Sequence, residues 1–196
     1  MNELKVIQIL KNDLGFSNSS IEKIKKFNNY LLQYNKNYNL ISKSTENDTW
    51  YRHILDSAQI IKFIDFTKIR NLADFGTGAG FPGLIIALYN ENPTFHVKLY
   101  EKSQVKRDFL KDLKNNLNIK NITIENNVYE KEVLADVIVC RAFKKLEEIL
   151  SISREIVKKP HKLIILKGKN AQSEINNVSL ESNYSYKMEK SITNDD

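Results

Sequence analysis

The chain has 196 residues, of which 41% are hydrophobic. This composition excludes a disordered chain and predicts one folded domain with an extension. The net charge is +6, and four of these six excess positive charges precede Asn71. The bias favours a polyanionic partner near the amino-terminal region, with a solvated lysine-rich helix surface as the alternative. A metal cluster or disulfide framework built on cysteine is excluded, because Cys140 stands alone.

The first seventy residues have the apolar spacing of helices. Leu4, Ile7 and Leu10 begin one helix, and Ser19 to Glu22 has the form of a capping box that opens a second. A third helix is predicted over Thr49 to Ile64. The opening residues show no signal-peptide pattern, and no apolar run is long enough to span a membrane. We therefore expect a cytoplasmic chain without a membrane anchor.

After Asn71, short apolar runs alternate with amphipathic helices. The predicted strands are Asn71–Phe75, His96–Tyr100, Ile122–Glu125, Asp136–Cys140 and Lys162–Leu166. The predicted helices are Pro82–Tyr89, Gln104–Leu117 and Lys145–Val157. This alternation is typical of right-handed βαβ units on a parallel sheet. It predicts an α/β fold with a doubly wound, mostly parallel sheet over residues 71–196 and a helical extension over residues 1–70. The tail, residues 184–196, offers one more possible strand.

The stretch NLADFGTGAGFPG carries two overlapping glycine patterns. Gly76, Gly78 and Gly80 form G-x-G-x-G, whereas Gly78, Gly80 and Gly83 form the G-x-G-x-x-G pattern of dinucleotide sites. Both patterns directly follow a predicted strand, which is where ligands bind in open parallel sheets. A plain glycine-rich turn is a third, weaker interpretation.

Two carboxylates favour the first pattern. Asp74 lies two residues before Gly76, where it suits a cationic ligand, such as a sulfonium with an amino group, better than a pyrophosphate. Glu101 ends the second predicted strand, where a carboxylate can accept hydrogen bonds from both hydroxyls of a ribose. The residues Asp74, Gly76, Gly78, Gly80 and Glu101 are therefore predicted to bind the cofactor.

Several separated segments resemble one known family. These are YNKNYNLIS, RHILDS, DFGTGAGFPG, CRAF and LKG, and they run in order from Tyr34 to Gly168. The chain resembles the glucose-inhibited division protein B family (GidB, RsmG), the ribosomal RNA small-subunit methyltransferases G. The resemblance implies a class I, Rossmann-like methyltransferase that uses S-adenosyl-L-methionine. It also implies the target, N7 of one guanine in small-subunit (16S) ribosomal RNA.

The resemblance also implies site residues. Carried over by position, the family's cofactor contacts fall on Gly76, Phe81, Val128, Tyr129 and Arg141. The chain departs from the family at the third of these places, where Asn127 to Glu130 replaces the usual R-x-E. It departs again at its end, where it stops near the point at which the family returns a last strand as a hairpin. Contacts of backbone groups with the adenine would survive the first departure.

Guanine N7 carries a lone pair and no proton, so its methylation needs no general base. Positioning and a suitable electrostatic setting are enough, with a cationic donor on O6 to orient the base. Arg141 and Lys167 follow predicted strands at the cofactor edge and are candidates for such contacts, with an ion pair to a neighbouring helix as the alternative for Arg141. Arg52 and His53 in RHILDS are further candidates, although Arg52 and Asp56 also have the spacing of a plain ion pair within a helix.

The predicted partner is small-subunit RNA or its particle, contacted by the amino-terminal helices. Lys23, Lys25, Lys26 and Lys36 would track phosphates, and Tyr34 and Tyr38 could stack on bases, although their spacing fits a helix core better. We expect a monomer without a metal. The alternatives are a methyltransferase acting on a small molecule, a nicotinamide-dependent oxidoreductase that uses Gly78, Gly80 and Gly83, and a non-catalytic RNA-binding protein on the same fold.

Overall fold

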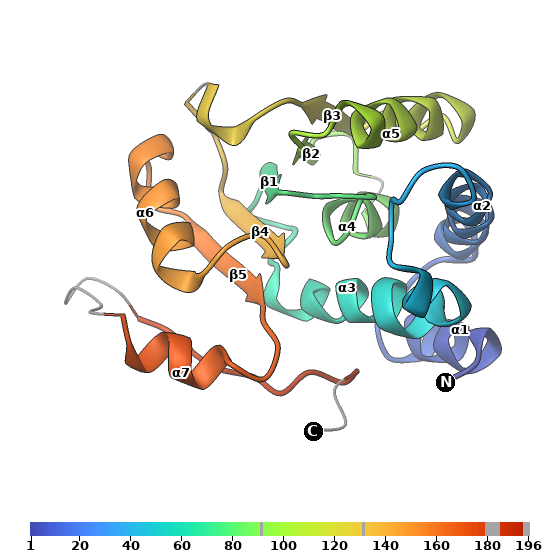
Figure 1. Cartoon of the computed structure of the whole chain (residues 1–196), viewed down its shortest axis with the longest axis horizontal. Coiled ribbons are helices and arrows are strands. Elements are labelled where there is room, and N and C mark those ends of the chain that lie inside the picture. Colours follow the sequence, from blue (N-terminus) through green and yellow to red (C-terminus); the bar gives the residue numbers. More distant parts are fainter. Residues whose placement is uncertain (91, 131, 179–184, 194–196) are drawn as a thin grey trace.

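A computed structural model describes residues 1–90, 92–130, 132–178 and 185–193 of the chain. Within them, one sheet has the strand order β3-β2-β1-β4-β5, with every neighbouring pair parallel. The strands are β1 (Asn71–Phe75), β2 (His96–Tyr100), β3 (Ile122–Glu125), β4 (Val137–Arg141) and β5 (Lys162–Leu166). Strand order reverses on either side of β1, so the fold is the predicted doubly wound parallel sheet (Figure 1).

Helices cover both faces of the sheet. The helices α4 (Gly83–Tyr89) and α5 (Gln104–Asn116) lie on one face, and α6 (Leu146–Ile156) lies on the other, followed by α7 (Ala171–Asn176) (Figure 1). Alternation along the strands separates two cores. Leu72 and Val97 belong to the core under α4 and α5, whereas Ala73 and Phe75 belong to the core under α6.

The amino-terminal helices share the first of these cores. The helices α1 (Glu3–Asn12) and α2 (Asn18–Asn35) contribute fully buried Leu10, Ile24 and Phe27 to the same cluster as α4 and α5. The helices of residues 1–63 thus share one core with α4 and α5. The predicted division of the chain at residue 70 stays a prediction.

Several boundaries differ from the prediction in instructive ways. The cap of α2 is Ser17, whose hydroxyl accepts the Ser20 amide at 3.0 Å, so the capping box predicted from Ser19 is wrong. The predicted third helix consists of three consecutive helical types: a π-helical segment (Trp50–Leu55), then α3 (Asp56–Ala58), then a 3₁₀ segment (Gln59–Phe63). Another 3₁₀ segment (Lys43–Asp48) precedes it. Strand β4 is shifted by one residue and ends at Arg141.

The tail forms no strand within its described residues 185–193. Instead, it lies against the end of the third helical segment, because the Ile192 amide donates to Gln59 Oε1 at 2.8 Å. Thr193 then donates its hydroxyl to Asp56 Oδ1 at 2.7 Å. The remainder of the predicted tail strand, Tyr184 and residues 194–196, lies outside the described residues.

Candidate functional site

The carboxyl ends of the parallel strands meet at one edge of the sheet, and the glycine loop joins this edge directly after β1. Gly76, Gly78 and Gly80 all have positive φ angles, of 71°, 60° and 105°. The amides of Gly76 and Thr77 both donate to the Tyr100 carbonyl at 3.0 Å, which ties the loop to the end of β2. The loop therefore has a backbone path that glycine adopts without strain.

The glycines serve different neighbours. A Cβ on Gly80 would approach Leu84 to 2.9 Å, and one on Gly83 would approach the Asp74 side chain to 2.7 Å, so both are required by close packing. A Cβ on Gly76 would meet the Phe143 ring at 2.4 Å. At Gly78 only the Gly76 carbonyl oxygen comes within 4.0 Å. Gly78 is thus the point at which the loop borders open space.

Asp74 is fully buried beneath the loop. Its Oδ2 accepts the Gly83 amide at 2.7 Å, which joins β1 to the first turn of α4. Burial raises the pKa of Asp74 to about 7, and hydrogen bonding from the Thr77 hydroxyl and the Gly83 amide opposes that rise. Asp74 Oδ1 and the Thr77 hydroxyl are buried and form no hydrogen bond of normal geometry in the described part of the chain, but the Thr77 hydroxyl is near enough to lower the pKa of Asp74.

Glu101 faces the loop from the end of β2. Its carboxylate accepts the Gly78 amide at 2.9 Å and the Ser103 amide at 2.8 Å, and the residue is only 7% exposed. Because a carboxylate has further acceptor positions, ribose hydroxyls could be added to these contacts. Glu101 therefore couples the second strand to the open point of the loop.

The predicted adenine contacts follow β3. Val128 is buried, whereas Tyr129 is 50% exposed. Beside them, at the carboxyl ends of β2 and β3, lies a hollow lined in part by Tyr100, Glu125 and Asn127. The predicted cofactor residues thus occupy one continuous edge, from Gly76 after β1 through Glu101 after β2 to Tyr129 after β3.

Arg141, at the end of β4, is the centre of a polar cluster. One guanidinium nitrogen, Nη1, donates to the Arg52 carbonyl at 3.0 Å and to Asp56 Oδ2 at 3.1 Å, and the other, Nη2, contacts His53 Nδ1 at 2.8 Å. The guanidinium carbon lies 5.1 Å from the centroid of the Phe81 ring. The structure therefore brings together Arg141, Phe81 and the RHILDS residues, which are more than 80 positions from Arg141 in the sequence.

His53 is held in its neutral form. Burial lowers the pKa of His53 to about 4, and the positive charges of Arg141 and Arg52 lower it further. Since Arg141 can only donate, Nδ1 must accept, and Nε2 then carries the proton that is donated to the Thr45 hydroxyl at 2.9 Å. The ring also stacks on Phe81 with centroids 5.2 Å apart. The contact between Thr45 and His53 was not expected from the sequence, because the residues that flank Thr45 in the chain carry no motif that indicates it.

Within the described residues, Arg52 and Asp56 do not form the ion pair that their spacing allows. Asp56 turns to Arg141, and the Arg52 side chain is exposed. Asp56 accepts, in addition, the hydroxyl of Thr193 from the tail.

Lys167 follows β5 and is already engaged. Its ammonium donates to the Lys144 carbonyl and to Glu174 Oε2, both at 2.7 Å. Glu174 Oε2 also accepts the Leu146 amide at 2.7 Å. The pair therefore fastens the loop after β4 to α7, and its predicted contact with a phosphate or O6 stays a prediction.

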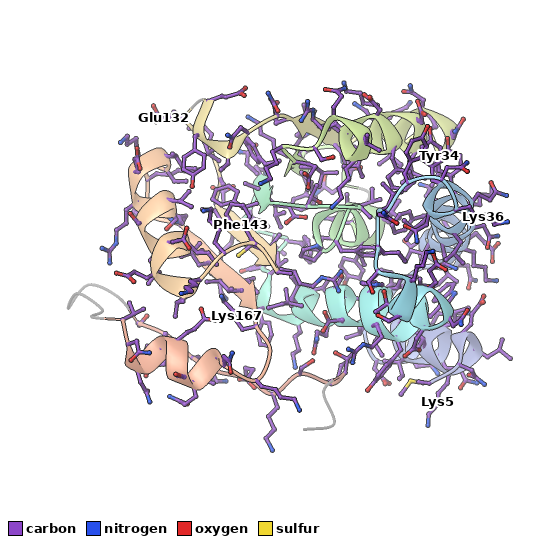
Figure 2. The ribbon with its side chains drawn as sticks, viewed as in Figure 1. Lys5, Tyr34, Lys36, Glu132, Phe143 and Lys167 are labelled. Atoms are coloured by element: carbon purple, nitrogen blue, oxygen red, sulfur yellow. The ribbon has the colours of Figure 1, made fainter. Side chains whose placement is uncertain are left out.

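The amino-terminal surface carries the other predicted contacts. Lys26 and Lys36 are exposed, Lys25 pairs with Glu22 at 2.9 Å, and Lys23 is partly covered. Tyr34 donates to Asp112 at 2.6 Å and packs against Phe109, which gives it a structural role, whereas Tyr38 is 46% exposed. Figure 2 shows Tyr34 in the last turn of α2 and Lys36 directly after it, both away from Phe143 and Lys167.

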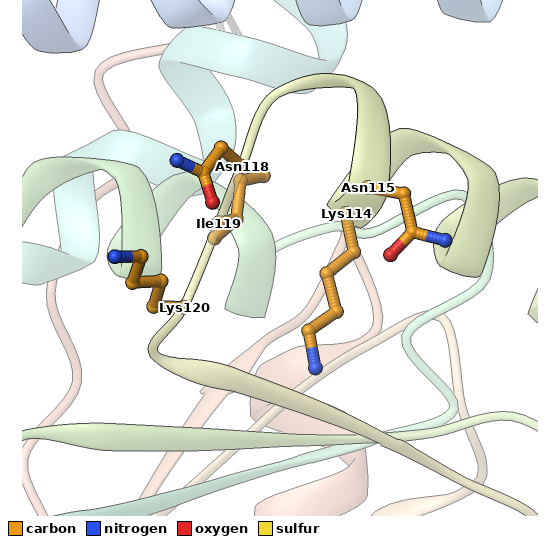
Figure 3. A pocket seen from close by; sticks show the side chains of 5 residues that line it. All are labelled: Lys114, Asn115, Asn118, Ile119 and Lys120. Carbon is orange, nitrogen blue, oxygen red and sulfur yellow. The ribbon is translucent and has the colours of Figure 1, made fainter.

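A shallow basic depression lies at the opposite edge of the sheet, where α5 ends. Lys114, Asn115, Asn118, Ile119 and Lys120 line it (Figure 3). Because α5 runs back from the carboxyl edge, this depression is remote from the glycine loop. In the described residues no helix has the length and apolar character of a membrane span, and no three side chains are grouped as metal ligands.

Comparison with known proteins gives the family. Residues 20–195 match the model of the GidB family, described as rRNA small subunit methyltransferase G. The chain is 32% identical to the ribosomal RNA small subunit methyltransferase G of Orientia tsutsugamushi (strain Ikeda), over 97% of this chain and 94% of the relative. It is 36% identical to the protein of the same name from Rickettsia felis, over 88% of each chain.

Among solved structures, a SAM-dependent methyltransferase from Aquifex aeolicus is 17% identical with a TM-score of 0.49, over 63% of this chain and 69% of that one. The family match spans the helical extension from α2, the glycine loop and the Arg141 cluster. The chain therefore belongs to the GidB family of small-subunit ribosomal RNA methyltransferases, as the resemblance of its motifs predicted.

Proposed function

We propose that the chain transfers the methyl group of S-adenosyl-L-methionine to N7 of a specific guanine in small-subunit ribosomal RNA. Family membership carries the reaction class, and the names of the relatives carry the substrate class. The observation in this chain that supports the cofactor best is the loop at Gly78, which borders open space and is joined to Glu101.

The carboxyl edge of the sheet fits the cofactor. Glu101 would hold the ribose, and the region of Val128 and Tyr129 would receive the adenine. The backbone of Gly76, Gly78 and Gly80 would lie against the remainder. The buried side chains of Asp74 and Phe81 would act from beneath, by fixing the loop and the Arg141 cluster. When bound, the cofactor supplies an activated methyl group on a positive sulfur.

Arg141 is the candidate for orienting the guanine. Its guanidinium has five N–H donors, of which the three described hydrogen bonds use three, so two remain for a base oxygen such as O6. His53 and the Arg52 carbonyl would hold the guanidinium in place. We prefer Arg141 to Lys167 for this contact, because Lys167 would first have to leave Glu174.

The amino-terminal helices would hold the RNA. Exposed Lys26 and Lys36 suit phosphates, and exposed Tyr38 suits a base. We expect the protein to act as a monomer in the cytoplasm, where ribosomal subunits are assembled. Family membership removes the nicotinamide-dependent alternative. No observation in the chain favours a small-molecule substrate or a non-catalytic role.

The test is a methyl-transfer assay. The protein is incubated with tritiated S-adenosylmethionine and small-subunit particles from a strain lacking this gene, and N7-methylguanine is mapped by chain cleavage. The Gly78→Val variant should lose cofactor binding and transfer, because its side chain fills the open point of the loop. The matched control is Gly168→Val, since nothing lies within 4 Å of a Cβ there. Label found only on protein or small molecules would contradict the proposal.

A further inference from the structure

The loop after β4 presents an aromatic ring at the carboxyl edge of the sheet. Ala142 has a φ angle of 49°, a conformation that a residue with a Cβ adopts only when its surroundings impose it. Its consequence is the direction of Phe143, which lies across the end of β1 and against Gly76 (Figure 2). The strain at Ala142 thus aims the ring at the glycine loop.

The ring is supported from below and its loop is fastened. Phe143 contacts Phe75 with centroids 6.2 Å apart. The next residue, Lys144, has its carbonyl held by Lys167, and Glu174 holds the Leu146 amide. Phe143 is nevertheless only partly buried, so the residue is not closed off from solvent. A side chain placed only to fill the core would not need such a support on one side and solvent on the other.

The ring lies on the side of the edge that the cofactor's reactive end would reach. The proposed ribose contact follows β2 and the proposed adenine contact follows β3, both on one side of β1. The sulfonium end must then extend toward β1 and β4. Phe143 is two residues beyond Arg141, which ends β4, and it touches the first glycine of the loop. The base to be methylated has to lie in this same place.

A guanine whose N7 is to be methylated must leave the base stack of the RNA, and the lost stacking has to be replaced. An accessible aromatic face is the group that replaces it, because every base has a π face. We propose that Phe143 is the surface on which the target guanine stacks while Arg141 binds its O6. This inference rests on the proposed function and adds the residue that holds the base.

The test compares Phe143→Leu with Phe143→Tyr in the transfer assay on small-subunit particles. Leucine keeps an apolar side chain but removes the π face, so kcat/KM for particles should fall by about 5- to 150-fold, the range measured for base–aromatic stacking. Tyrosine keeps the face and should retain most of the activity. Affinity for S-adenosylmethionine alone, measured by calorimetry, should change by less than about threefold, because the base and not the cofactor is stacked. Tyr186→Leu, which alters a 62% exposed ring in the tail, is the control.

A second measurement does not depend on how well the leucine variant folds. In Phe143→Trp, the added indole should be quenched when particles bind in the presence of S-adenosylhomocysteine. The background comes from Trp50, which is buried, with 7% of its surface exposed. The absence of quenching in a variant that binds particles would overturn the proposal.

Three other results would also overturn it. One is wild-type activity in Phe143→Leu, and another is a parallel loss of cofactor affinity, which would make the ring a cofactor contact. The third is tighter cofactor binding with unchanged transfer, which would make the ring a gate. Failure of the proposed function looks different, because the wild-type protein itself would then leave the particles unmethylated.

Discussion

Replacement of Gly76 by alanine tests the contact between the glycine loop and Phe143. Gly76 has a φ angle of 71°, and an L-residue in the left-handed region costs about 1–2 kcal/mol. The added Cβ would also lie 2.4 Å from Phe143 Cδ2, closer than van der Waals contact permits. The ring has to move, and overpacking of this kind costs about 1–3 kcal/mol. We expect the free energy of unfolding to fall by roughly 2–5 kcal/mol in total.

Alanine substitutions at two other glycines are the controls for this loss of stability. Gly78→Ala has the same backbone problem, with a φ of 60°, but its Cβ has only the Gly76 carbonyl oxygen at 4.0 Å. It should therefore lose about 1–2 kcal/mol. Gly168→Ala has neither a positive φ nor a neighbour within 4 Å, and should stay within about 0.5 kcal/mol of the wild type.

The measurement is urea unfolding followed by circular dichroism, arranged as a double-mutant cycle with Phe143→Ala. Removal of the ring removes the steric part of the cost, so Gly76→Ala in that background should cost only the backbone part, about 1–2 kcal/mol. If Gly76→Ala is equally destabilising with and without the ring, Phe143 does not pack on Gly76, and the reasoning about the loop is refuted.

Three further predictions concern charge. Asp74 has its pKa raised to about 7 from 3.8, so its contribution to stability is present below about pH 4 and lost as the pH rises to 7; Asp74→Asn should abolish this loss in unfolding experiments at a series of pH values. His53 has its pKa lowered to about 4 from 6.5, so its contribution is present above pH 6.5 and lost as the pH falls toward 4; a flat difference between wild type and His53→Gln over that range would contradict the neutral form. Replacement of exposed Lys36 by glutamine should weaken particle binding and make the slope of log K against log salt shallower by about 0.7–0.9, and an unchanged slope would remove it from the RNA interface.

The sheet could be predicted from the sequence because each strand is a short apolar run bounded by turn or helix signals. Four of the strands have the predicted bounds, and β4 is shifted by one residue because Arg141 continues the pairing with Leu166. The helical segment over Trp50–Phe63 was harder. Its apolar residues satisfy a helical period, but the period does not reveal that the segment changes from a π turn to a 3₁₀ turn.

The Arg141 cluster shows where local reasoning ends. Asp56 and Arg52 are four residues apart, so their spacing indicates an ion pair. In the structure Asp56 pairs instead with Arg141, which is 85 positions away. Only the strand order, which sets the end of β4 beside the third helical segment, brings the two together. Phe143 was equally hidden. It belongs to the CRAF tetrapeptide, yet nothing in those letters indicates that Ala142 has a positive φ.

The protonation state of His53 agrees with the chemistry that the family membership implies. A general base must accept a proton near the operating pH, and therefore needs a pKa near 7 and a free nitrogen. His53 has neither, because its pKa is about 4 and its two nitrogens contact Arg141 and Thr45. A histidine in this state suits a reaction in which the nucleophile has no proton to lose. Its neutral ring accepts a hydrogen bond from Arg141 without competing for the Asp56 carboxylate, which leaves the guanidinium fixed beside the proposed place of methyl transfer.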